Sequence, residues 1–202
     1  MDFSSVLEKR RSIRKFDVRP LAGEDVEAIL EAGRRAPSGG NIQPWRYVVV
    51  EDEAVRKRLK EASPLSFFAE APFLILACFD REAIKKMPER FAELTASNAF
   101  GDITMDAGKM EALRAQRAND EVEKASYAVY NTAISVTHMD LTAVARGLGT
   151  CWIGMFDKEK VREILGLDER YGIVCFLQIG YALQDPLPRP RLSLDDTILQ
   201  RI

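Results

Sequence analysis

The sequence predicts an α+β fold in which helices pack around one central sheet. Helical patterns and short β-branched runs follow one another without the strict alternation that builds a parallel sheet. The run Phe73–Phe79 is apolar at every position, as expected of a strand that is buried on both faces. The longest helical pattern, Ala125–Leu148, is apolar around much of its circumference, which predicts a helix at the centre of the molecule.

The first third of the chain predicts three helices and one strand. A short helix over Asp2–Lys9 runs into a cluster of arginines. Apolar residues at helical spacing predict a second helix over Gly23–Arg35, and Pro37 ends it. A β-branched strand over Trp45–Glu51 precedes an amphipathic helix over Asp52–Ala62.

The rest of the chain predicts two further strands and a variable excursion. Residues 81–125 are charged and interrupted by glycine, and we interpret them as helical pieces joined by an irregular segment. Gly147 and Gly149 end the long helix. Strands are expected over Cys151–Ile153 and Ile173–Tyr181, with a helix over Lys158–Leu165 between them.

Size and composition indicate one domain of residues 1–202 in a reducing compartment. The chain has 202 residues, of which 47% are hydrophobic, and a formal net charge of -2, so no general basic field for nucleic acid exists. The three cysteines, Cys78, Cys151 and Cys175, lie in apolar runs and are predicted to be buried thiols. No signal peptide is recognisable, and no apolar run approaches the ~20 residues that span a bilayer, so we expect a cytoplasmic protein.

Two arginine clusters and one loop point to a bound phosphate. Arg10-Arg11-Ser12-Ile13-Arg14 lies near the start of the chain, and Arg189-Pro190-Arg191 near its end. Guanidinium groups bind phosphate through paired, charge-assisted hydrogen bonds. The segment Ala36-Pro-Ser-Gly-Gly-Asn-Ile-Gln-Pro-Trp45 is rich in residues that let the backbone approach a flat ligand. Each feature alone also suits a solvated helix end or an ordinary turn, whereas their combination favours a phosphorylated, planar cofactor.

Other chemistries find little support. Gly147-Leu-Gly149 with Gly154 lacks the dinucleotide fingerprint spacing and follows a helix instead of a strand. His138 is the single histidine, and its place on the long helix favours a packed core residue over a catalytic base. No nucleophile elbow, carboxylate pair or metal-ligand cluster is recognisable, so no metal is expected.

Four motifs, in the same order, resemble the FMN-dependent nitroreductase family. They are Arg10-Arg-Ser-Ile-Arg-Lys-Phe16, Ala36–Trp45, Gly147-Leu-Gly-Thr-Cys-Trp-Ile-Gly154 and the Arg189-Pro-Arg191 pair. Only residues 81–125 fall outside the resemblance. It implies a mostly antiparallel central sheet flanked by helices, a long central helix, and an intertwined homodimer with FMN at the interface between subunits.

The resemblance also implies roles for individual residues. Arg10, Ser12, Arg189 and Arg191 would hold the phosphate and ribityl end, and Arg14 would lie near the pyrimidine edge of the flavin. The partner subunit would contribute Pro37, Ser38 and Gly39, with help from Asn41. Backbone at Gly154 and Met155 would lie near flavin N5, where the Met side chain narrows the pocket; these two and Arg14 are the catalytic candidates. The full cofactor set is Arg10, Arg11, Ser12, Arg14, Pro37, Ser38, Gly39, Asn41, Gly154, Met155, Arg189 and Arg191.

The activity implied by the resemblance is a ping-pong oxidoreductase. NADH or NADPH would give hydride to flavin N5, and an electron-poor acceptor such as a nitroaromatic or quinone would then take it. Residues 81–125 would form a lid with Phe100, Met105 and Met110 toward the substrate. The apolar tail within residues 189–202 would dock on the partner. Two alternatives stay open: a specialised flavin-cleaving or dehalogenating member, and a flavin-binding protein that is not an enzyme.

Overall fold

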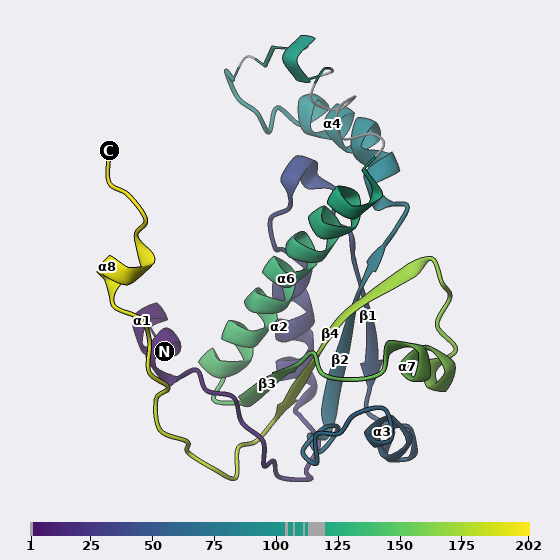
Figure 1. Ribbon diagram of the computed structural model, residues 1–202, viewed down its shortest axis with the longest axis vertical. Coiled ribbons are helices and arrows are strands. Elements are labelled where there is room, and N and C mark those ends of the chain that lie inside the picture. The colour runs from purple at the N-terminus through teal and green to yellow at the C-terminus, as the bar shows by residue number, and fades with distance from the viewer. Residues whose placement is uncertain (1, 104, 107, 111, 113–119) are drawn as a thin grey trace.

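A four-stranded antiparallel sheet forms the centre of the protein, as the computed structural model shows (Figure 1). The structure describes residues 2–103, 105–106, 108–110, 112 and 120–202. The strands are β1 (Trp45–Val50), β2 (Phe73–Asp80), β3 (Gly149–Ile153) and β4 (Tyr171–Gly180), in the spatial order β1-β2-β4-β3. The α+β class and the antiparallel sheet expected from the sequence are confirmed.

Helices cover both faces of this sheet. The helices α2 (Gly23–Arg34) and α6 (Glu121–Ala145) pack on one face, where Ile29 and Met139 meet Ile75 and Leu177 in a buried cluster. The helices α3 (Glu53–Lys60) and α7 (Lys158–Leu165) pack on the other face. The result is three layers, with α6 crossing the middle of the molecule (Figure 1).

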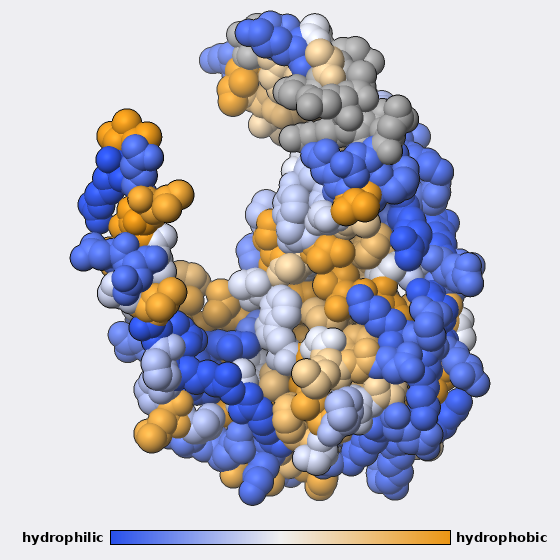
Figure 2. Space-filling view, viewed as in Figure 1, coloured by the Kyte–Doolittle hydropathy of each residue, from blue (hydrophilic) through white to orange (hydrophobic). Residues whose placement is uncertain are grey.

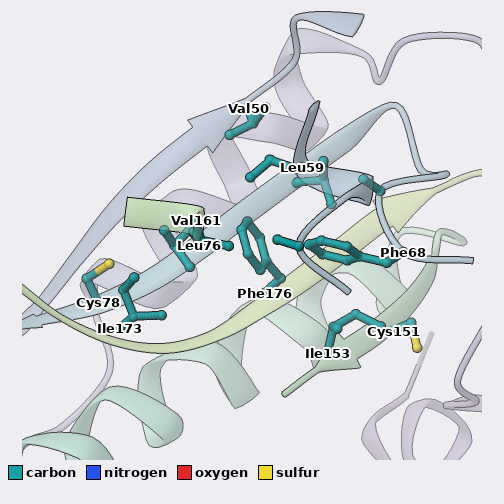
Figure 3. Close-up of a cluster of buried hydrophobic side chains, with 13 residues drawn as sticks. Val50, Leu59, Phe68, Leu76, Cys78, Cys151, Ile153, Val161, Ile173 and Phe176 are labelled. Carbon is teal, nitrogen blue, oxygen red and sulfur yellow. The ribbon is translucent and has the colours of Figure 1, made fainter. Parts of the chain in front are cut away.

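The central strand β2 is buried at all eight positions, as its continuous apolar run predicts. Its side chains alternate between the two faces because successive strand residues point in opposite directions. Leu76 and Cys78 enter the cluster under α3 and α7, together with Phe176 and Phe68 (Figure 3). Two apolar layers on one strand explain why the sheet needs helices on both sides.

The helix α6 is shifted from its predicted span of Ala125–Leu148. It begins at Glu121, because the Asp120 side chain accepts a hydrogen bond from the backbone N–H of Glu123. It ends at Ala145, since Gly147 takes a left-handed conformation with φ of 80° and lets the Leu148 N–H reach back to the Ala143 carbonyl. The sequence did not predict this offset, because charged residues at the amino end hide the start of the helix.

The position of His138 differs from the expectation. The fully buried face of α6 carries its neighbours Met139 and Ser135, while His138 itself is half-buried. The interpretation as a packed core histidine was therefore too strong. A helical position next to the core differs from one within it by a single step of about 100°, which apolar spacing alone resolves poorly.

Short elements complete the chain. They are α1 (Phe3–Lys9), the 3-10 turns η1 (Gly39–Asn41) and η2 (Ala83–Lys86), α4 (Met87–Ala96) and α8 (Leu194–Thr197). The helix α4 lies beyond the amino end of α6, whereas α1 lies near its carboxyl end (Figure 1). The tail with α8 leaves the body without packing on it, and Leu199 and Ile202 are fully exposed.

All three cysteines are free and buried, as predicted. Burial raises the pKa of Cys78 and of Cys175 to about 12, and it also raises the pKa of Cys151. Thiols with such pKa values stay protonated at neutral pH and react slowly. In the part of the chain that the structure describes, no helix has the length and apolar character needed to cross a membrane.

Candidate functional site

The segment after α1 lies along the edge strand β3. The Ile13 N–H donates to the Thr150 carbonyl at 2.7 Å, and Ser12 forms a parallel bridge with Thr150. Gly149 makes this approach possible, since a Cβ there would stand 2.8 Å from Ile13 Cγ1. The sheet edge thus fixes the backbone on which the first arginine cluster is carried.

A basic pocket opens between this segment and the start of the tail. Its volume is about 620 Å³. Figure 2 shows the hydrophilic surface at the base of the tail. The residues that line it come from the end of α1, the arginine segment and the chain before α8: Leu7, Glu8, Lys9, Arg10, Arg11, Ser12, Arg14, Pro186, Leu187, Pro188, Arg189 and Arg191.

The pocket concentrates positive charge from opposite ends of the chain. Six of its lining residues are basic and one, Glu8, is acidic. Six predicted cofactor residues lie here together: Arg10, Arg11, Ser12, Arg14, Arg189 and Arg191. A concave surface with one sign of charge attracts an oppositely charged ligand and binds it with paired guanidinium hydrogen bonds.

Arg10 is bound by a buried carboxylate, that of Asp140. Its Nε donates to Asp140 Oδ2 at 2.9 Å, and the Asp140 side chain is only 6% exposed. Thr150 Oγ1 donates to Asp140 Oδ1 at 2.5 Å, and Trp152 Nε1 donates to Oδ2 at 2.8 Å. Asp140 was not among the predicted site residues, although an acidic residue on the buried face of an apolar helix is a signal that could have found it.

Three other pocket arginines donate to backbone carbonyls, and no acidic side chain among the described residues pairs with them. Arg11 Nη1 donates to the Arg10 carbonyl at 2.8 Å, and Arg191 Nη1 to the Pro190 carbonyl at 3.1 Å. Arg14 Nη1 donates to the Ser12 carbonyl at 3.2 Å, and its Cζ lies 5.2 Å from the centre of the Phe67 ring. Because carbonyls carry no full charge, these guanidiniums remain available to an anion.

The loop 36–45 lies elsewhere in the subunit. The Gly39 N–H donates to Asn131 Oδ1 at 2.9 Å, and a Cβ at Gly39 would overlap the Tyr127 hydroxyl. Asn131 precedes Asp140 on α6 by about 13 Å along the helix axis, at roughly 1.5 Å per residue. The structure therefore separates Pro37, Ser38, Gly39 and Asn41 from the arginine pocket. Asn131, the buried amide that anchors this loop, was also not predicted from the sequence.

Gly154 and Met155 follow β3 and are exposed. A Cβ at Gly154 would meet nothing within 4 Å, so open space lies above it. The Met155 carbonyl accepts a hydrogen bond from Ser63 Oγ at 2.6 Å, and its side chain is 61% exposed. The loop that carries Ser63 also carries Phe67, the ring beside Arg14. Both residues thus follow β3, the edge strand whose Thr150 contacts the arginine segment.

None of the predicted lid residues lines the pocket, and Phe100 packs on α4. Phe100 packs on Phe91 with ring centres 5.0 Å apart, Met105 is 38% exposed, and Met110 is half-buried. The Cγ of Met87 would lie 3.6 Å from a Cβ at Gly40, which places α4 against the loop 36–45. One subunit therefore presents the predicted residues in two separate groups. Among the described residues, no three His, Cys, Asp or Glu side chains are grouped to hold a metal ion.

Comparisons with known proteins agree on one family. Residues 7–181 match the model of the Nitroreductase family. The chain is 33% identical over 203 residues to an NADH dehydrogenase of Thermus thermophilus, covering 100% of this chain and 97% of that protein. It is 30% identical over 203 residues to YdgI of Bacillus subtilis, provisionally named an NAD(P)H nitroreductase, with 96% and 95% covered.

Solved structures share the fold. A protein from Exiguobacterium sibiricum, whose structure holds FMN, superimposes with a TM-score of 0.82 at 24% identity, covering 100% of this chain and 98% of that one. A nitroreductase family protein from Streptococcus pneumoniae gives a TM-score of 0.78 at 25% identity, with 99% and 100% covered.

Proposed function

The chain belongs to the nitroreductase family, and we propose that it is an FMN-dependent oxidoreductase that passes hydride from NADH or NADPH to an electron-poor acceptor such as a nitroaromatic or a quinone. One observation carries the proposal: Arg10, Arg14, Arg189 and Arg191 meet in a single pocket although they come from opposite ends of the chain. The relatives named for NADH or NAD(P)H chemistry support the choice of electron donor.

The residues of the pocket suit a flavin mononucleotide. Its volume, about 620 Å³, lies within the roughly 300–1,000 Å³ typical of small-molecule sites. Those pocket guanidiniums that have no acidic partner among the described residues match a phosphate group, which carries about two negative charges. The space above Gly154 leaves room for a planar ring next to backbone. Phosphate at one end and a ring near β3 would place both parts of the cofactor along one edge of the sheet.

The protein's own residues would bind and orient the flavin. When bound, the flavin supplies the redox chemistry, since it can take up and release a hydride in two separate half-reactions of a ping-pong cycle. Arg10, Arg189 and Arg191 would hold the phosphate, and Ser12 the adjoining ribityl chain. Arg14 would place positive charge beside the ring. No side chain acts as a nucleophile in this scheme, which agrees with the absence of a triad from the sequence.

We propose that the active unit is a homodimer. A second copy could bring its loop 36–45 and its lid against the arginine pocket, which would unite the two groups of site residues that one subunit separates. The tail offers a matching apolar arm: Leu192, Leu194, Leu199 and Ile202 are all at least two-thirds exposed. Exposed apolar groups on an extended arm are typical of a segment that packs on a partner.

Removing the arm is expected to dissociate the dimer. A chain that ends after Arg191 keeps the predicted phosphate ligands and loses Leu192–Ile202. Sedimentation equilibrium should show a dimer for the full chain and a monomer for the shortened one. A full chain that sediments as a monomer at micromolar concentration would contradict the proposed assembly, whatever the shortened chain does.

The proposed function is tested by the visible spectrum of the purified protein. We expect flavin absorption bands that bleach under anaerobic conditions when NADH or NADPH is added, and that return when a quinone is added. The more effective nucleotide identifies the donor. Bands that persist with both nucleotides would instead favour a flavin-binding protein. No flavin, even after incubation with FMN, would reject the proposal.

Replacing Arg14 by alanine is expected to lower the reduction potential of the bound flavin. A positive charge near the ring stabilises the reduced, anionic form, so its loss favours the oxidised form. We expect a shift of tens of millivolts, about 30 mV for each 1.4 kcal/mol in a two-electron couple. Equilibration with a redox dye measures the potential. Arg34→Ala on α2 is the control, and an unchanged potential in Arg14→Ala would exclude the tuning role.

A further inference from the structure

Asp140 is a buried carboxylate whose place in the fold calls for an explanation. It lies on the face of α6 that packs against the body, where the neighbouring buried residues include Met139, Ala143 and Val144. A carboxylate in such surroundings is costly unless it is paired and fully hydrogen-bonded. An apolar side chain would fit this helix face more simply, so stability alone does not account for Asp140.

Its three hydrogen-bond donors come from two distant parts of the chain. Thr150 and Trp152 on β3 hold the two carboxylate oxygens, and Arg10, at the end of α1, completes the set. The Thr150 backbone carbonyl meanwhile accepts from Ile13. The carboxylate is therefore fixed by the sheet edge before it meets Arg10, and it can impose an orientation on the guanidinium.

The orientation concerns which side of the guanidinium faces the pocket. Asp140 bonds to Nε of Arg10, and neither Nη group of Arg10 hydrogen-bonds to a residue that the structure describes. Arg10 lines the pocket, and its side chain is 26% exposed. Both Nη groups remain for a pocket anion, in the paired geometry that suits phosphate.

We propose that Asp140 is a positioning residue for Arg10: it holds the guanidinium so that its Nη groups are set for the cofactor phosphate before the cofactor binds. This inference rests on the proposed function, because it takes the anion to be the FMN phosphate. Fixing a long side chain in advance removes the entropy cost of ordering it on binding.

The negative charge of Asp140 acts in the opposite direction, since it also repels a phosphate. A test must therefore keep charge and geometry apart. Asp140→Asn and Asp140→Ala both lack the charge. The asparagine amide oxygen can still accept from Arg10 and Trp152, and its amide group can donate to Thr150 Oγ1, whereas alanine can hold none of them. The difference between the two variants reports on geometry alone.

The measured quantity is the preference for FMN over riboflavin, which lacks the phosphate. Dissociation constants of both flavins are measured by fluorescence quenching with the flavin-free full chain. We expect the preference for FMN over riboflavin to be about three- to tenfold lower in Asp140→Ala than in Asp140→Asn. In the alanine variant the Arg10 side chain must be ordered when the phosphate binds. In chains that also carry Arg10→Ala, Asp140→Asn and Asp140→Ala should show the same preference for FMN over riboflavin.

The experiment needs two controls. Asp80→Asn removes another buried carboxylate that binds an arginine, on a distant part of the sheet, and should leave the preference for FMN unchanged. Circular dichroism checks that each variant is folded. Should Asp140→Ala fail to fold, Asp140→Ser replaces it, because a serine hydroxyl keeps a polar partner for Thr150 but is too short to hold Arg10 as well.

The outcomes separate the two proposals. Equal preferences in Asp140→Asn and the Ala or Ser variant, in a protein that does prefer FMN, would overturn the positioning role alone. A difference that persists in the Arg10→Ala background would also overturn it, because the effect would not pass through Arg10. A wild-type chain that binds neither flavin would reject the proposed function and this inference with it.

Discussion

Replacing Arg189 and Arg191 together by alanine is expected to yield a protein that loses its FMN on dialysis. Both side chains line the basic pocket on the segment before α8, and neither has an acidic partner among the described residues. A hydrogen bond to a charged group contributes about 1.5–3 kcal/mol, so two lost contacts should weaken binding by about a hundredfold or more.

The reason for the loss can be checked with riboflavin. If the two arginines bind phosphate, the double variant should lose affinity for FMN and keep its weaker affinity for riboflavin. The double variant Arg34→Ala with Arg35→Ala is a matched control, since these exposed arginines pair with Glu31 on the opposite side of α2 from the core. A double variant at 189 and 191 that stays fully loaded after dialysis would remove both residues from the phosphate site.

Of the substitutions proposed, Asp80→Ala is expected to lower the free energy of unfolding the most. The Asp80 side chain is 1% exposed at the end of β2, where Arg170 Nε and Nη2 donate to it at 2.8 and 2.6 Å. Its Oδ1 also accepts from the Glu82 N–H at 3.0 Å. The Arg170 side chain is 44% exposed, so its charge is solvated when Asp80 is removed, and the loss is that of the charge-assisted hydrogen bonds, about 1.5–3 kcal/mol. Urea unfolding should show this as a lower midpoint with an unchanged slope.

Glu31→Ala serves as the control for Asp80→Ala. Glu31 also pairs with arginines, Arg34 and Arg35, but on the exposed surface of α2, where solvent screens the interaction. Its midpoint should therefore stay near that of the wild type. Equal midpoints for Asp80→Ala and the wild type would show that the pair with Arg170 contributes nothing to folding.

The pair also predicts how stability changes with pH. The hydrogen bonds from Arg170 hold the pKa of Asp80 below its usual value. A lowered pKa in the folded state means that the contribution is fully present above the unfolded pKa of about 3.9 and is lost as the pH falls through the folded pKa. Stability of the wild type should therefore fall below pH 4 more steeply than that of Asp80→Ala. If the stabilities of the wild type and of Asp80→Ala fall in parallel as the pH is lowered, Asp80 does not have a lowered pKa in the folded state.

Local patterns predicted most of the elements. The helix over Lys158–Leu165 has the predicted bounds, because Asp157 caps its start and Gly166 ends it in a left-handed conformation. Where such capping signals were weak, the observed bounds of an element differ from the predicted ones. The strand β4 begins at Tyr171 instead of Ile173, since pairing with Asp80 extends it. Pairing depends on a neighbour that is distant in sequence, and no local pattern contains it.

The candidate site was predicted in its parts but not in its arrangement. The arginines could be predicted because two arginine clusters and a loop rich in Pro and Gly occur in one chain, and the structure places the arginines in one pocket. Asp140 could be noticed only as an acid on an apolar helix face, and neither its partner nor that of Asn131 could be predicted, because a side chain on a helix gives no local sign of what it will contact. Arg10 approaches Asp140 only after α1, α6 and β3 have packed.

The layers could be predicted from the amino-acid sequence, since the apolar run of β2 requires helices on both faces, and so could the residue types that a phosphate needs. Three features emerge only in the folded chain: its two ends share one pocket, Asp140 binds Arg10, and the loop 36–45 lies apart from both. The physical reason is that hydrophobic periodicity and turn chemistry act over a few residues. Charge pairing and pocket shape depend instead on contacts that form only when distant segments pack together.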